Sequence, residues 1–402
     1  MMIINPVIVE PLTAEWEQAK AEITALMDKA ASSKGGAATK ARNQAQGILD
    51  AYLKRLGDFR VLDPACGSGN FLYLALRSLK DLEHRAQVEA EALGLPRGFP
   101  RIGPEVVRGI EINPYAAELA RVSVWIGEIQ WMLKNGFAAS GNPILKPLNT
   151  IECRDALLDK SGAVTEWPRA TVVVGNPPFL GNKKLSRKLG EEYVSRLRTA
   201  YDGRVPHGAD FVIYWFWHAA QLVQSHQVEA AGLVGTQAIR RGSNRKVLDG
   251  FISEGRIFNA WSDEEWTVDG ADVRVSLVCM DRRDSGETLL DGRRVDRIGS
   301  DLVAGLEVTQ PATLTVNRGK CFQGTISGGP FEVPGEIARK WLKDPVNPNG
   351  RANSDVLHPW RNADDIAGRC SDTWIIAFPD QLTEDAASLY EHPYEHLKKA
   401  WQ

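Results

Sequence analysis

Residues 61–72 read VLDPACGSGNFL, and this stretch decides the fold. A short apolar run passes into a tight loop that contains Gly67 and Gly69, and a helical pattern follows. A strand that turns into a helix in this way places the loop at the carboxyl edge of a parallel sheet, where such folds bind ligands. The glycines let the backbone approach a ligand where any Cβ atom would collide.

The loop differs from loops that bind a dinucleotide pyrophosphate. Such a loop reads G-x-G-x-x-G, whereas Leu72 stands at the position of the third glycine and no phosphate-binding lysine follows. The loop therefore favours a ligand with a zwitterionic amino-acid tail. A plain strand-to-helix turn is the alternative.

Outward from this loop, short apolar runs alternate with longer amphipathic segments. The pattern predicts an α/β fold with a doubly wound, mostly parallel, seven-stranded sheet and helices on both faces. The last two runs are too close together for a crossover helix, so one of them is expected to be antiparallel. The seven runs cover residues 59–63, 106–112, 150–153, 171–175, 232–239, 257–262 and 273–281.

The sequence divides into three expected parts. Residues 1–57 form a helical segment that packs on the next domain, and its first helix is expected over 13–30 with Thr13 as the cap. Residues 58–305 form the sheet domain. Gly, Pro and Asn become frequent in residues 306–402, which we expect to be a smaller α+β region. Just before it, Asp291-Gly292 predicts a hairpin turn.

Composition restricts the class of protein. The chain has 402 residues, a formal net charge of −3 and five scattered cysteines without a C-x-x-C pair, which argues against a disulfide framework and a zinc site. We expect no metal. No apolar run is long enough to span a bilayer and no signal peptide is visible, so a cytoplasmic protein without a membrane partner is expected. Residues 183–256 hold twelve Lys and Arg against seven Asp and Glu, so nucleic-acid contact is expected there first.

Acidic residues follow the second and third strands. Glu111 closes the second strand, and its carboxylate can accept both hydroxyls of a ribose. Asp155 lies just past the third strand, where it can accept a hydrogen bond from an adenine amino group. A helix N-cap is the alternative for Asp155. Their neighbours Ile112 and Ala156 are expected at the same site.

The strand 171–175 delivers Asn176-Pro177-Pro178-Phe179. Two prolines remove backbone donors and stiffen the loop, so its carbonyl groups are free to point inward. The Asn176 side-chain oxygen and the Pro177 carbonyl can accept both hydrogens of a planar NH2 group. They would stabilise the positive charge that grows as that nitrogen attacks a sulfonium methyl group. Phe179 offers a stacking face for a base rotated out of a duplex. A rigid turn is the alternative.

With these four segments in place, the chain resembles the class I S-adenosylmethionine-dependent amino-methyltransferases. The order, with D-P-A-C-G-S-G-N-F before N-P-P-F, is similar to the gamma-type DNA adenine enzymes of restriction–modification and phage-defence systems. The similarity runs to about residue 281 and more loosely to the end. It implies methyl transfer from S-adenosylmethionine to the N6 amino group of adenine in double-stranded DNA, with base flipping.

The resemblance also implies roles for the residues already named. It implies a cofactor site made by Asp63, Ala65, Gly67, Gly69, Glu111, Ile112, Asp155 and Ala156. It implies a catalytic loop made by Asn176, Pro177, Pro178 and Phe179. A ring from the aromatic stretch 211–217, such as Phe211 or Trp215, is a candidate to pack on the cofactor adenine, with core packing as the alternative.

Two departures from the family bear on the ends of the chain. Family members carry an upstream Tyr-Thr cofactor loop, and this chain begins with Met1-Met2-Ile3-Ile4 about where that loop should end. We therefore expect one wall of the cofactor pocket to be missing. Residues 306–402 would form a short or partial target-recognition region. A nuclease or an upstream domain of the same system is the expected partner.

Other readings remain open to different degrees. Methylation of cytosine C5 needs a nucleophilic cysteine, typically in a Pro-Cys pair, and no such pair occurs. Methylation of cytosine N4, or of a protein glutamine at N5, uses a similar nitrogen. A catalytically silent subunit for DNA recognition or assembly is the alternative from a different class.

Overall fold

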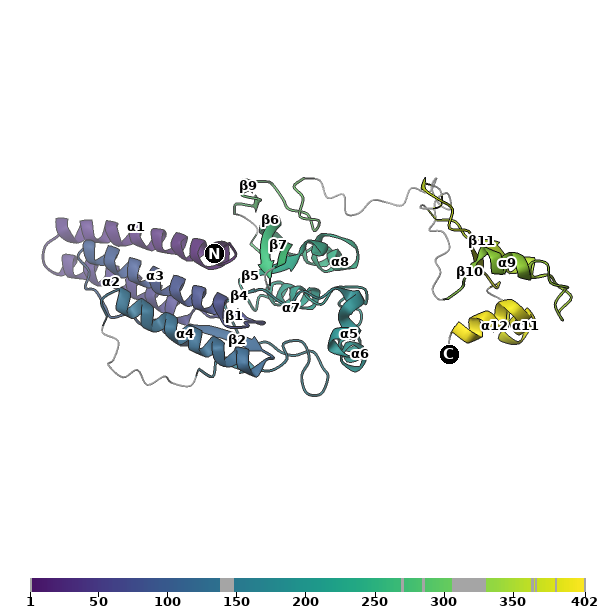
Figure 1. The fold of residues 1–402 in the computed structure, drawn as a ribbon. Coiled ribbons are helices and arrows are strands. Elements are labelled where there is room, and N and C mark those ends of the chain that lie inside the picture. The colour runs from purple at the N-terminus through teal and green to yellow at the C-terminus, as the bar shows by residue number, and fades with distance from the viewer. Residues whose placement is uncertain are drawn as a thin grey trace. The chain divides into compact units, whose positions relative to one another are not determined.

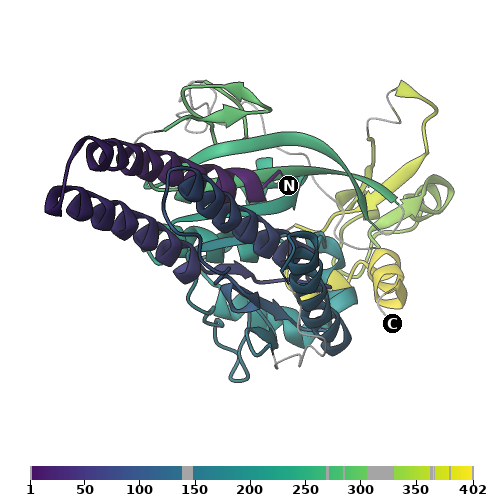
Figure 2. The same cartoon turned by 90° about the vertical axis from the view of Figure 1, so that its left-hand side faces the viewer.

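The structure is a computed structural model in two compact units, Met1–Pro311 and Ala312–Gln402. Figures 1 and 2 show both units from two directions. The sequence pattern changes near residue 305, a little before this division. The structure describes residues 2–137, 148–268, 271–283, 286–305, 330–362, 365, 367–379 and 382–400.

The first unit begins with two long antiparallel helices (Figure 1). A π-helical turn, Asn5–Val9, leads directly into α1 (Glu10–Ser32), and α2 spans Gly36–Asp58. The prediction of a first helix capped by Thr13 was wrong, because α1 starts earlier and Thr13 lies inside it. Pro11 is tolerated in the first turn of α1, where a backbone N–H has no partner within the helix.

One sheet organises the first unit, and nine strands of it lie among the described residues. Their order is β3-β2-β1-β4-β5-β7-β6-β8-β9. All neighbours from β3 to β5 are parallel, whereas β7 is antiparallel to both β5 and β6, as the short connection predicts. The strands are β1 (Val61–Asp63), β2 (Val107–Glu111), β3 (Ile151–Cys153), β4 (Val172–Gly175), β5 (Ala230–Thr236), β6 (Arg256–Val268), β7 (Ala271–Asp281), β8 (Leu289–Leu290) and β9 (Arg293–Arg294).

The expected number of seven strands was therefore too low. The hairpin predicted around Asp291-Gly292 forms β8 and β9, and it joins the sheet because β8 pairs in parallel with β6. The pairing covers Asn259 with Leu289 and Ala260 with Leu290. The Asp-Gly turn predicted the hairpin, but two-residue strands have too little periodicity to show that it joins the sheet, where the edge of β6 offers unpaired backbone groups as partners.

Helices cover both faces of the sheet, and successive strand residues point to opposite faces. Val61 packs in one hydrophobic cluster and Leu62 in the other; Val172 and Val173 divide in the same way. Helices α1 to α4 contribute to the first cluster, and α5 to α8 to the second. The remaining helices of this unit are α3 (Asn70–Ala92), α4 (Pro114–Lys134), α5 (Leu185–Leu189), α6 (Glu191–Ala200), α7 (Ile213–Gln224) and α8 (Gly242–Phe251).

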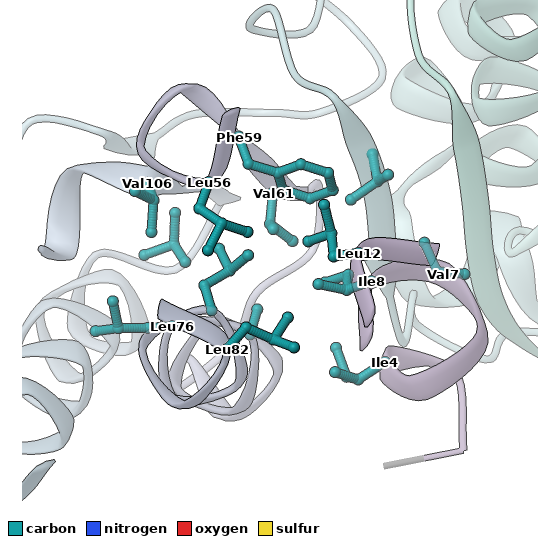
Figure 3. Close-up of a cluster of buried hydrophobic side chains, with 14 of the residues drawn as sticks. Ile4, Val7, Ile8, Leu12, Leu56, Phe59, Val61, Leu76, Leu82 and Val106 are labelled. Atoms are coloured by element: carbon teal, nitrogen blue, oxygen red, sulfur yellow. The ribbon is translucent and has the colours of Figure 1, made fainter. Parts of the chain in front are cut away.

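The N-terminal segment shares the core of the sheet domain. Ile4, Ile8 and Leu12 are fully buried, and Figure 3 shows them in one cluster with Leu56, Phe59 and Leu82. Burying an aliphatic side chain of this size stabilises a fold by about 1.5 to 3 kcal/mol. The first residues of the chain are thus part of the domain that holds the site.

Strands β6 and β7 form a hairpin that extends beyond their pairing with the rest of the sheet. They contain 13 and 11 residues, and irregular pairing interrupts the ladder near Asn259 and Glu264. Strand β5 pairs with β7 only as far as Val275, and the ladder with β6 continues beyond it. Trp266 pairs with Val273 in this projecting part.

The second unit contains a small antiparallel sheet with the order β10-β12-β11. Val333, Leu357 and Ile376 of this sheet pack with Leu397 in a core of their own. Across the described residues of both units, every helix is too short or too polar to cross a membrane. The elements of the second unit are β10 (Glu332–Pro334), α9 (Gly335–Trp341), β11 (Leu357–Pro359), β12 (Thr373–Ile376), α11 (Glu384–Ser388) and α12 (Glu391–Ala400).

Candidate functional site

The loop between β1 and α3 depends on its glycines. Gly67 and Gly69 have φ values of +53° and +86°, in the left-handed region. The amide of Gly69 donates to the carbonyl of Cys66 at 2.8 Å, which closes the turn just before α3. A Cβ atom at Gly69 would lie 2.9 Å from Cα of Ala120 on α4, so a side chain there would separate the two helices.

Asp63, the last residue of β1, is a buried acid. Its Oδ1 accepts a hydrogen bond from the amide of Ala65 at 3.0 Å, while Oδ2 has no partner among the described residues. Burial raises the pKa of Asp63 to about 7. A buried carboxylate with an unmet oxygen is suited to a cationic donor.

Glu111 ties the ends of β2 and β1 together. Its Oε2 accepts from the amide of Gly67 at 3.0 Å, and its Oε1 accepts from the amide of Asn113 at 2.8 Å. Each carboxylate oxygen can accept more than one hydrogen bond, so both stay available to a ligand. The carboxylate is thereby held in one place beside the glycine loop.

Asp155 follows β3 and is held from two sides. Its Oδ1 accepts from the amides of Leu157 and Leu158 at 2.7 and 3.3 Å, in a turn rather than at the start of a helix. Its Oδ2 accepts from the hydroxyl of Tyr193 at 2.8 Å. Burial and the neighbouring Asp155 raise the pKa of Tyr193, so the phenol stays protonated and remains a donor.

Asn176 leaves β4 with its side-chain oxygen buried and without a partner among the described residues. Pro177 is buried and Pro178 is exposed. Phe179 is half-buried and packs against both hydrophobic clusters. An unmet buried oxygen costs about 1 to 3 kcal/mol, so this acceptor is suited to a donor that the described residues do not provide.

Two cavities meet at this edge of the sheet, and Ala65 and Asn176 line both of them. The larger measures about 540 Å³ and the smaller about 480 Å³. Of the residues expected at the site, the larger cavity is lined by Ala65, Glu111, Ile112, Asp155, Ala156, Asn176 and Pro178. The smaller is lined by Asp63, Ala65, Gly67 and Asn176. Gly69, Pro177 and Phe179 do not line either cavity.

Further side chains line the larger cavity. Tyr193 and Lys188 line the larger cavity, together with the two candidate rings Phe211 and Trp215. Trp215 Nε1 donates to the carbonyl of Pro64 at 3.0 Å, which links α7 to the glycine loop. The aromatic stretch 211–217 was a usable signal, whereas nothing local marks Tyr193.

The smaller cavity brings together distant parts of the chain. Trp266 reaches it from the β6–β7 hairpin, and Met2 and Ile3 reach it from the first residues. We expected one wall of the cofactor pocket to be missing near the first residues of the chain. In the structure, Met2 and Ile3 line the smaller cavity. Contacts between such remote segments depend on tertiary packing, so no sequence pattern could have indicated them.

Basic side chains gather on two segments that follow β4 and β5. The residues exposed on them are Lys183, Lys184, Arg187, Lys188, Arg241 and Lys246, and Arg240 and Arg245 are half-buried. The described residues contain no cluster of three His, Cys, Asp or Glu side chains able to hold a metal ion.

Comparison with known proteins gives a consistent result. Residues 37–291 match the family model described as "MmeI, DNA-methyltransferase domain". DNA methyltransferase A of Bacillus subtilis strain 168 is 31% identical over an alignment of 223 residues that covers 50% of this chain and 24% of that protein. The type II methyltransferase M.BstVI of Geobacillus stearothermophilus is 26% identical over 201 residues, 50% of this chain and 32% of that enzyme.

Among solved structures, the type IIL restriction–modification enzyme MmeI in complex with DNA has a similar fold. The TM-score is 0.60 at 19% identity, over 98% of this chain and 52% of the MmeI chain. The chain therefore spans about half of MmeI and less of the two relatives above. S-adenosylmethionine is the expected cofactor, because the matched relatives are methyltransferases. The family model matches more than half of the sequence, and the chain belongs to the family of MmeI-type DNA-methyltransferase domains.

Proposed function

We propose that this chain transfers a methyl group from S-adenosylmethionine to the N6 amino group of adenine in double-stranded DNA, with the target base flipped out of the duplex. The proposal rests on the buried Oδ1 of Asn176, which lacks a partner in the part of the chain that the structure describes and belongs to a residue lining both cavities. The proposed context is a restriction–modification or phage-defence system.

The cavities fit the two halves of the cofactor, which when bound supplies a methyl group on a positively charged sulfur. Glu111 and Asp155 both line the larger cavity, where Glu111 would accept the ribose hydroxyls and Asp155, beside Tyr193, would accept from the adenine amino group. In the smaller cavity, the free Oδ2 of Asp63 is a suitable partner for the ammonium group of the methionine part.

The catalytic loop suits an amino group as the methyl acceptor. Asn176 Oδ1 and the Pro177 carbonyl would accept the two amino hydrogens and favour positive charge on the nitrogen as it reacts. Two successive prolines hold these acceptors in place without a reorganisation cost at the moment of reaction. Phe179 would then stack on the base, for which it would have to become more accessible than it is in its half-buried position.

Double-stranded DNA is the proposed partner. The basic side chains after β4 and β5 follow strands that end at the catalytic edge, so they would meet the phosphates of a duplex whose base enters the site. MmeI was solved in complex with DNA. That relative is a restriction–modification enzyme with about twice the length matched here, and we propose a nuclease or an upstream domain as a further partner.

Incubating the chain with S-adenosylmethionine and duplex DNA, then measuring modified nucleosides by mass spectrometry, tests the proposal. N6-methyladenine that disappears with Asn176→Ala is the expected result. N4-methylcytosine would correct the target base, and methylated glutamine in added protein would correct the substrate class. Cofactor binding without any methylated product would overturn the proposal in favour of a silent recognition or assembly subunit.

A further inference from the structure

Asp210 lies in the connection between α6 and α7, three residues before α7 begins at Ile213. Its Oδ1 accepts a hydrogen bond from the amide of Asn182 at 2.7 Å, at the end of the stretch that follows the catalytic loop. Next to this contact, the amide of Phe211 donates to the carbonyl of Leu180 at 2.9 Å. Two consecutive residues of one connection thus hold the chain just beyond Asn176 to Phe179.

The second oxygen of Asp210 belongs to a reciprocal pair with Asn244. Asn244 Nδ2 donates to Asp210 Oδ2 at 2.8 Å, and the amide of Asp210 donates back to Asn244 Oδ1, also at 2.8 Å. Asn244 is buried in the first turn of α8, and its Nδ2 also donates to the carbonyl of Ala238 at 3.2 Å. Both ends of the Asn244 amide are in use, so rotating it by 180° would break these bonds.

These bonds join segments that are far apart in the sequence. Asn182 begins the short helical turn with Lys183 and Lys184. Ala238 and Asn244 flank Arg240 and Arg241 on the other basic segment. Asp210 therefore connects both basic segments to the chain that leaves the catalytic loop.

We propose that Asp210 is a positioning residue that, with Asn244, fixes the two basic segments relative to Asn176. DNA phosphates held by the basic segments then set where the flipped base meets the catalytic amide. This inference rests on the proposed function, since it assigns those segments to DNA. If Asp210 only stabilised the fold, its substitution would not couple a loss of DNA affinity to a loss of methyl-transfer rate.

The hydrogen-bond pattern requires one acid and one amide. In Asp210→Asn, the new amide keeps one acceptor for Asn182, but its NH2 group then faces the NH2 group of Asn244. In Asn244→Asp, two carboxylates face each other across the same contact. Exchanging both residues restores one donor and one acceptor at that contact, and loses the bond to Ala238.

The test compares Asp210→Asn, Asn244→Asp and the exchanged double variant in the full chain. Asp202→Asn is the matched control, because Asp202 has the same charge on the same connection and pairs with the exposed His207. Each single variant should lower the turnover number about tenfold or more and weaken DNA binding, while S-adenosylmethionine affinity changes less than about threefold. The double variant should recover most of both losses, and the control should match the wild type.

Hydrogen exchange of the wild-type chain provides a second measurement that needs no variant to fold. The amides of Asn182 and Asp210 should exchange slowly and be released together. Independent exchange of these two amides, or a double variant whose losses equal those of its single variants combined, would overturn the proposed positioning role of Asp210. A wild-type chain that neither binds nor methylates DNA would instead remove the proposed function, and slow joint exchange would then still support the physical connection.

Discussion

At the scale of single residues, the carboxyl group of Asp63 gives the site a dependence on pH. Its ordinary pKa of 3.8 is raised to about 7 by burial. The folded chain therefore binds more protons than the unfolded chain between these values, and Asp63 lowers the free energy of unfolding as pH rises from about 4 to 7. An ammonium group of the cofactor would prefer the ionised form.

Cofactor affinity should therefore increase as pH rises towards 7, by up to about tenfold per pH unit, and level off above it. Calorimetry from pH 5.5 to 8.5 measures this, and buffers of different ionisation enthalpy report the released proton. Asp63→Asn should remove the slope, whereas Asp58→Asn, which changes an exposed acid nearby, should keep it. A flat wild-type profile would exclude Asp63 as the partner of a cation.

Glu111 is the residue whose loss should affect cofactor binding most directly. Glu111→Ala removes the proposed acceptor for the two ribose hydroxyls and should weaken S-adenosylmethionine binding by roughly 1.5 to 3 kcal/mol. Because Glu111 also holds the amides of Gly67 and Asn113, Glu111→Gln is the milder variant that keeps one acceptor oxygen. Glu118→Ala on α4 is the control, since Glu118 is exposed. Unchanged calorimetric affinity in both Glu111 variants would remove this residue from the site.

Asn176 should matter for turnover more than for binding. Asn176→Ala should leave cofactor affinity nearly intact and reduce methyl transfer about 100-fold or more, because the lost acceptor counts most as charge develops on the nitrogen. Single-turnover kinetics with saturating DNA and cofactor separate the two effects. Equal losses of affinity and rate would assign Asn176 a structural role.

At the scale of elements, the two basic segments should carry the salt dependence of DNA binding. Neutralising Lys183, Lys184 and Arg187, or separately Arg241 and Lys246, should lower the slope of log affinity against log salt by about one per lost phosphate contact. Binding isotherms at several salt concentrations give the slope. Neutralising Lys40 and Arg42, which are exposed on α2 of the same unit and follow neither β4 nor β5, serves as the comparison. A slope that no variant changes would identify the segments as ordinary solvated surface.

Local patterns predicted those elements that have enough residues to show a period. Buried strands such as Val172–Gly175 read as continuous apolar runs, and the closely spaced β6 and β7 predicted an antiparallel neighbour. The two-residue strand Leu289–Leu290 is too short for any period. The start of α1 was misplaced because a Pro in its first turn reads as a boundary.

The same limit applies to the site. The positions of Asp63, Glu111 and Asp155 at the sheet edge could be predicted, because the first two end a strand, the third lies just past one, and parallel strands end at one edge. Tyr193 and Trp266 could not be predicted, because their positions depend on how α6 and the β6–β7 hairpin pack. Sequence thus indicates the acids and loops at strand ends, whereas the positions of Tyr193 and Trp266 in the cavity walls are seen only in the tertiary structure.

At the scale of the whole molecule, we expect the two compact units to have different functions. We propose residues 58–305 as the catalytic domain, supported by residues 1–57, and 306–402 as a target-recognition region. Ending the chain at Pro311 should leave the melting temperature of the first unit and its S-adenosylmethionine affinity nearly unchanged, because that unit has its own core. Discrimination between DNA sites should fall, as competition binding with different duplexes would measure. Full discrimination by the shortened chain would place recognition in the first unit.

The projecting β6–β7 hairpin has a consequence for aggregation with other copies of the chain. Past Ser262, the outer side of β6 has no partner strand among the described residues, and an open edge of this kind can recruit strands of other chains. Asp263, Glu264 and Glu265 occupy this stretch, with Arg274 paired to Asp263 and Glu265 across the ladder. Like charges on every copy would repel an incoming edge. The acidic stretch thus lets the hairpin extend far enough to bring Trp266 to the cavity without becoming a site of aggregation.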